Sequence, residues 1–156
     1  MKRKIALCIP LVLAMGTFAL AQNGYHVTTP STWKMDTAAS DMGGAPDAPK
    51  SDEYTVTKDT DKWLTYKETM VGADGKTMHM SWNGPVDGKP LPVDGQAGAK
   101  CGFSADGKSH CTFADGSVMD QQLHPLAMDA KTATFDATYK DKAGKEYHEK
   151  WVYNRQ

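Results

Sequence analysis

Hydrophobic and polar residues alternate along most of this chain, a period of two that is typical of β-strands with one buried face. Helical periodicity is nearly absent, and turn signals such as Asp74-Gly75, Asp106-Gly107 and Asp115-Gly116 separate the alternating runs. We therefore predict an all-β protein, an antiparallel up-and-down meander of about eight or nine strands. The expected strands lie near Trp33–Asp36, Tyr54–Asp59, Lys62–Val71, Lys76–Asn83, Ala99–Ser104, Lys108–Phe113, Ser117–His124, Thr132–Lys140 and Lys145–Tyr153.

The hairpin around Ala105-Asp106-Gly107 predicts a disulfide. A common three-residue hairpin loop is a type I turn followed by a glycine in the left-handed region. With this loop, Ser104 faces Lys108 and Cys101 falls directly opposite Cys111. Alternation along the ladder makes the cysteines a non-hydrogen-bonded pair, where side chains are closest. We expect a Cys101–Cys111 disulfide, and a metal site is the weaker alternative because few further ligands lie nearby.

Three-residue loops preserve strand parity, so the same rule predicts which face of each strand is buried. In the second half the apolar residues are odd-numbered, including Phe135, Tyr139 and Trp151, and in the first half they are even-numbered, including Tyr66 and Trp82. The change of parity falls in the Pro- and Gly-rich segment Gly84–Gly98, which can hold at most a short edge strand. Such a meander can hide its edges by closing into a lipocalin-like barrel, and a two-layer β-sandwich is the alternative.

The first residues predict export. A basic stretch, Lys2 to Lys4, precedes an apolar run and the small-residue sequence Ala19-Leu20-Ala21, as in secretory signal peptides. We expect residues 1–21 to be a signal peptide, residues 22–156 a single β-barrel domain, and the protein to be periplasmic or extracellular. Loss of the three basic residues takes the net charge from −1 to −4. This balance argues against nucleic acid as a partner, and we expect no membrane insertion after cleavage.

The N-terminal sequence STWKMDTAASDMGGAP, the internal DGKPLPVDG and the C-terminal DKAGKEYHEKWVYNRQ resemble a set of small exported bacterial proteins of unknown function. The Trp at the start of the first strand is also distantly similar to lipocalins, although Ser31 stands where those barrels have Gly. The resemblance implies a calycin-like barrel. It implies no activity.

Two carboxylates interrupt the predicted inside face. Glu68 lies between Tyr66 and Met70, and Glu149 lies between Tyr147 and Trp151. A buried carboxylate is costly unless it is paired or hydrated. One interpretation is an acidic, aromatic cavity for a small polar or cationic ligand, and the other is that both carboxylates lie in water near a barrel mouth. The candidate ligand-binding residues are Tyr66, Glu68, Trp82, Tyr139, Tyr147, Glu149 and Trp151.

The segment Thr77–Trp82 contains two methionines on one strand face, and thioethers are soft ligands that select Cu(I). A periplasmic Cu(I) site would use Met70, Met78, Met80 and Trp82, although ordinary core packing is the favoured interpretation. A third function class is a non-catalytic structural or protein-interaction module of the cell envelope. No catalytic motif is present, so we expect no enzyme activity and no cofactor.

Overall fold

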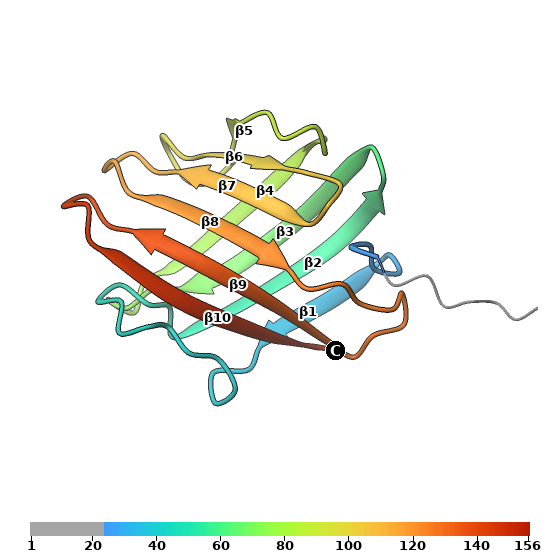
Figure 1. The fold of residues 1–156 in the computed structure, drawn as a ribbon, viewed down its shortest axis with the longest axis horizontal. Coiled ribbons are helices and arrows are strands. Elements are labelled where there is room, and N and C mark those ends of the chain that lie inside the picture. Colours follow the sequence, from blue (N-terminus) through green and yellow to red (C-terminus); the bar gives the residue numbers. More distant parts are fainter. Residues whose placement is uncertain (1–23) are drawn as a thin grey trace, which may run out of the picture.

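A computed structural model describes residues 24–156, and the predicted signal peptide at 1–21 lies outside these residues. A single antiparallel sheet of ten strands contains nearly all of the regular structure, in the order β4-β3-β2-β1-β10-β9-β8-β7-β6-β5 (Figure 1). The strands are β1 Ser31–Met35, β2 Ser51–Thr60, β3 Trp63–Val71, β4 Thr77–Pro85, β5 Leu91–Pro92, β6 Lys100–Phe103, β7 Lys108–Thr112, β8 Val118–Leu123, β9 Thr132–Lys140 and β10 Glu146–Arg155.

The sheet curls into a nearly closed up-and-down barrel, which confirms the predicted fold class and the barrel rather than the sandwich. In Figure 1, β7 to β10 form the near wall and β2 to β4 the far wall. β1 and β10, which lie near opposite ends of the chain, pair between these walls.

The seam of the barrel closes through Asp94, just after β5. The Asp94 N–H donates to the Ser81 carbonyl at 2.9 Å, and the Ser81 N–H donates to the Asp94 carbonyl at 3.0 Å. Gly95 permits this approach, because its φ is +83° and a Cβ there would overlap the carbonyl oxygen of His79 on β4.

The predicted register is confirmed across the hairpins. Cys101 pairs with Cys111 and forms the predicted disulfide. On the next strands Tyr139 pairs with Tyr147, and Phe135 pairs with Trp151. In the first half Tyr66 pairs with Trp82 and Met70 with Met78, as expected for a three-residue hairpin loop at Ala73-Asp74-Gly75. The alternation of side chains therefore places both predicted apolar faces inside one barrel.

The Pro- and Gly-rich segment holds only β5, a strand of 2 residues at the end of the strand order, in agreement with the prediction of at most a short edge strand. The structure differs from the sequence-based prediction in two places. β2 begins at Ser51 rather than near Tyr54. A β-bulge between Val56 and Lys58 changes the parity of β2, so that Asp59 comes opposite Leu64. Bulges of this kind re-aim a side chain at the end of a strand.

Within residues 24–156 we find no helix with the length and apolar character needed to span a membrane.

Candidate functional site

The barrel encloses a cavity of about 240 Å³. Its wall is mostly apolar and aromatic, and a few polar side chains converge on it from different strands. This composition is the usual one for a small-molecule site. The side chains that the next paragraphs discuss are Asp52, Tyr54, Asp59, Tyr66, Glu68, Met80, Phe103, Trp151 and Tyr153.

Asp52 and Glu68 form a carboxyl pair on the cavity wall. β2 and β3 are hydrogen-bonded neighbours, Asp52 pairs with Met70, and Glu68 lies diagonally across on the same inner face. The two carboxyl groups are close enough for each to influence the ionisation of the other. Asp52 Oδ2 accepts a 2.6 Å hydrogen bond from the Tyr153 hydroxyl. Asp52 Oδ1 is buried and has no hydrogen-bond partner.

The surroundings of the pair favour its protonated form. Burial raises the pKa of Asp52 from 3.8 to about 6, against the opposing effect of the Tyr153 hydrogen bond. Burial also raises the pKa of Glu68 well above its ordinary value, and the neighbouring Asp52 charge adds to the effect. Two like charges at this separation in a low-dielectric interior repel each other, so the pair retains a proton that isolated carboxyl groups would lose.

Tyrosine side chains surround the carboxyl pair. The ring of Tyr54 packs edge-on against Tyr153 with a centroid separation of 4.9 Å, and Tyr66 packs edge-on against Phe103 at 5.7 Å. Burial, followed by the nearby carboxylates, raises the pKa of Tyr54, Tyr66 and Tyr153 well above its ordinary value. These phenols are therefore neutral and can act as hydrogen-bond donors near neutral pH.

One end of the cavity is bordered by Asp59, which the β2 bulge turns inward, and by the segment that precedes β1. His26 Nδ1 is hydrogen-bonded to Asp59 Oδ1 at 2.7 Å, and the Val27 N–H donates to Asp59 Oδ2 at 2.7 Å. Tyr25, His26 and Val27 contribute to the cavity wall. Asp59 thus fixes the chain before β1 across this mouth of the barrel.

The structure brings only some of the predicted ligand-binding residues together. Tyr66, Glu68 and Trp151 line the cavity. Trp82 is 1% exposed and donates from Nε1 to the Cys101 carbonyl at 3.1 Å, so it is packed into the core. Trp82 therefore packs behind the residues that line the cavity and is not part of the cavity surface.

Tyr139, Tyr147 and Glu149 are not part of the cavity wall, although Glu149 contacts Trp151, which is part of it. The Tyr139 hydroxyl donates to Asp47 at 2.5 Å, and the Tyr147 hydroxyl to Asp141 at 3.4 Å. Glu149 is 6% exposed and accepts a 2.7 Å hydrogen bond from Trp151 Nε1. Burial raises the pKa of Glu149, and the Trp151 hydrogen bond opposes this shift. The two carboxylates singled out in the sequence therefore have different surroundings.

The methionines of the copper hypothesis occupy the inner face as expected. Met70 and Met78 are cross-strand partners, and Met80, opposite Glu68, is 6% exposed. His79 points to the other side of β4, where its Nδ1 is hydrogen-bonded to the Thr69 hydroxyl at 3.1 Å. The copper hypothesis stays a prediction.

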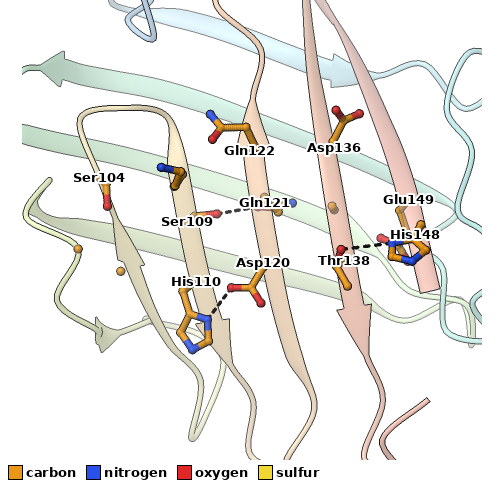
Figure 2. Close-up of a pocket in the computed structure, with 14 residues that line it drawn as sticks. Ser104, Ser109, His110, Asp120, Gln121, Gln122, Asp136, Thr138, His148 and Glu149 are labelled. Atoms are coloured by element: carbon orange, nitrogen blue, oxygen red, sulfur yellow. Dashed lines mark hydrogen bonds and ion pairs between the residues drawn. The ribbon is translucent and has the colours of Figure 1, made fainter. Parts of the chain in front are cut away.

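A second hollow, of about 640 Å³, lies over β7 to β10 (Figure 2). His110, Asp120, Thr138 and His148 lie in register across these strands, and His110 is hydrogen-bonded to Asp120 at 2.7 Å. The hydroxyl of Ser109 donates to Gln121, as Figure 2 shows, rather than to either histidine. The hollow is thus a polar surface whose side chains bond their neighbours, and it shows no activated nucleophile.

Asp52 is the cavity residue that sequence reasoning missed. The segment Thr37–Asp52 is rich in Ala, Gly, Pro and Asp, a composition typical of a surface loop, and the predicted strand therefore starts only at Tyr54. Extending the even parity one step back from Tyr54 would have placed Asp52 beside Glu68 on the inner face.

Comparison with protein-family models and a search of curated proteins found no match to this chain. The resemblance to small exported bacterial proteins therefore stays a prediction, and the functional argument rests on the barrel interior.

Proposed function

We propose that this protein binds a small molecule inside its barrel. The observation that carries the proposal is the cavity of about 240 Å³, whose aromatic and apolar wall contains polar side chains of Asp52, Glu68 and Tyr153. At about 30 Å³ per water molecule in the liquid, this volume corresponds to roughly eight waters, or an organic molecule of about ten non-hydrogen atoms.

The polar groups of the cavity support binding rather than simple core packing. A core that only needs stability is best filled by apolar side chains, because buried carboxyl groups carry a desolvation penalty. Here Asp52 is 3% exposed, and one of its oxygens lacks a partner. A ligand that fills the cavity and supplies a hydrogen-bond donor would give this oxygen a partner and offset the desolvation penalty of the carboxyl group.

Export is part of the same proposal. The disulfide is typical of proteins in oxidising compartments, and the N-terminal sequence has the features of a signal peptide. We propose that the barrel works outside the cytoplasm, in the periplasm or beyond it.

Methionine methyl NMR tests binding in the cavity. The protein carrying ¹³C-methyl methionine would be titrated with 2-phenylethanol, which has about the volume the cavity holds. We expect the Met80 methyl signal to shift, because Met80 lines the cavity, while Met128, which is 59% exposed, stays unchanged.

Cavity-filling variants provide the matched control. Val56→Phe places a larger side chain in the cavity wall, whereas Val118→Phe makes the same change on the outer face of β8. We expect the Met80 response to be lost only in Val56→Phe. The proposal is wrong if 2-phenylethanol and its amine and acid analogues at millimolar concentration all leave the Met80 signal in place.

A further inference from the structure

The carboxyl pair on the cavity wall has no cationic partner. In the part of the chain that the structure describes, the salt bridges involve other acidic residues, and none includes Asp52 or Glu68. Buried acidic groups in proteins are ordinarily paired or bound to a cation. Lys108 and His26 also border the cavity, but Lys108 pairs with Asp106 and His26 with Asp59. The two carboxyl groups, left without a protein cation of their own, are complementary to a positively charged ligand.

Asp52 Oδ1 marks where the positive group would bind. Asp52 Oδ2 accepts from the Tyr153 hydroxyl, while Oδ1 is buried without a partner in a residue that lines the cavity. An unsatisfied buried acceptor is rare in native structures and costs free energy. A ligand N–H directed at Oδ1 would satisfy it through a charge-assisted hydrogen bond.

The aromatic wall suits an organic ammonium group. Tyr54, Tyr66 and Tyr153 surround the pair, and aromatic rings attract cations over their faces. The rest of the wall is apolar, with Leu64, Met80 and Phe103 among its members. A ligand with one charged end and one apolar end would match both parts of the cavity.

A metal ion and an anion fit less well. Hard divalent cations take about six or more oxygen ligands, and residues 24–156 contain no group of three or more His, Cys, Asp or Glu side chains arranged to hold a metal. An anion would be repelled by Asp52 and Glu68. The remaining class is a small amine in its protonated form.

We infer that the cavity binds a small organic ammonium ion with an apolar body, whose N–H groups donate to Asp52 and Glu68. This inference rests on the proposed small-molecule function and names its ligand class. Binding releases a proton to solvent, because the ammonium ion replaces the proton that the carboxyl pair holds in the free protein. The titratable groups facing the pair are Tyr153 from β10, Tyr66 from β3 and Tyr54 from β2 itself, while Glu53 lies next to Asp52 in sequence with its side chain on the outer face.

The test compares three probes of similar shape by isothermal titration calorimetry. They are 2-phenylethylamine, which is protonated at neutral pH, neutral 2-phenylethanol and anionic phenylacetate. We expect the amine to bind at least about tenfold more tightly than the alcohol, since a hydrogen bond to a charged group is worth that much. Its affinity should rise with pH between about pH 5 and 7, by at most about tenfold per pH unit for one displaced proton.

Three variants show whether the carboxyl pair is responsible. Asp52→Asn and Glu68→Gln should each reduce amine affinity by about tenfold and leave alcohol affinity nearly unchanged. Glu146→Gln removes the same charge from an exposed position on β10, outside the cavity wall, and should change neither affinity. Met80 methyl spectra of each variant check that the fold and the cavity are retained.

The outcomes separate the inference from the function on which it rests. If the alcohol binds as tightly as the amine, or the carboxyl variants leave amine affinity intact, the ligand class is wrong while cavity binding stands. If none of the three probes binds and the Met80 signal stays fixed, both are wrong.

Discussion

The buried Asp52 carboxyl predicts a pH dependence of stability opposite to that of most salt-bridged carboxylates. Burial raises the pKa of Asp52 from 3.8 to about 6 in the folded protein. The folded state therefore binds more protons than the unfolded state between these values, and the free energy of unfolding falls as pH rises through this range. At about 1.4 kcal/mol for each pH unit, the loss contributed by Asp52 approaches about 3 kcal/mol by pH 7.

Asp52→Asn isolates this effect. The asparagine oxygen can still accept from the Tyr153 hydroxyl, and its amide can donate to Glu68, whereas no carboxylate is left to deprotonate at position 52. We expect the variant and the wild type to have similar stability near pH 4. The variant should then become more stable, by about 3 kcal/mol at pH 7.

Urea denaturation at a series of pH values from about 4 to 7 measures the difference directly. Surface acids such as Asp74 and Asp106 do not disturb it. Hydrogen bonds from Lys76 and Lys108 lower the pKa of these two carboxyl groups below 3.8. Any stability that they contribute is therefore lost only as pH falls through and below that value, and the loss is the same in the variant and the wild type. A difference that stays flat from pH 4 to 7, or that favours the wild type at pH 7, would refute the reasoning about a buried, desolvated pair.

Three further predictions concern other parts of the chain. Replacing both Cys101 and Cys111 by serine should lower the free energy of unfolding by about 3 kcal/mol, and ready alkylation of both thiols in the oxidised, folded protein would disprove the bond. Met80→Ala should cost about 2–4 kcal/mol in urea denaturation without changing Cu(I) affinity, whereas tight stoichiometric Cu(I) binding that Met78→Ala and Met80→Ala abolish would establish a copper site. The exported protein should begin at Gln22, and an intact mass that still includes Met1 would contradict cleavage after Ala21.

Local turn chemistry was enough to predict much of the barrel. The Asp106-Gly107 turn placed Cys101 opposite Cys111, and the turns that follow extended the same parity to Trp151. This worked because a hairpin couples residues that are close in sequence, and because a one-residue slip would expose a whole apolar face.

The features that sequence reasoning missed arise from longer-range contacts. β1 pairs with β10, and Asp94 is hydrogen-bonded to Ser81. No hairpin turn connects the segments in either contact, so the local sequence pattern does not predict that they pair. The bulge in β2 interrupts the alternation of inward and outward side chains. Strict alternation would place Asp59 on the outer face, whereas the bulge places it on the inner face. Asp52 was missed because a polar residue after a loop-like segment resembles a turn residue, although its strand continues the buried face.

A crystal structure of the protein with 2-phenylethylammonium tests the central claim most directly. The claim predicts that the ligand occupies the cavity of about 240 Å³ with its phenyl ring against the aromatic wall. Its nitrogen should lie within about 3 Å of Asp52 Oδ1, the buried oxygen that lacks a partner in the free protein. A cavity that holds only water at saturating ligand, or a ligand whose nitrogen points away from Asp52 and Glu68, would contradict it.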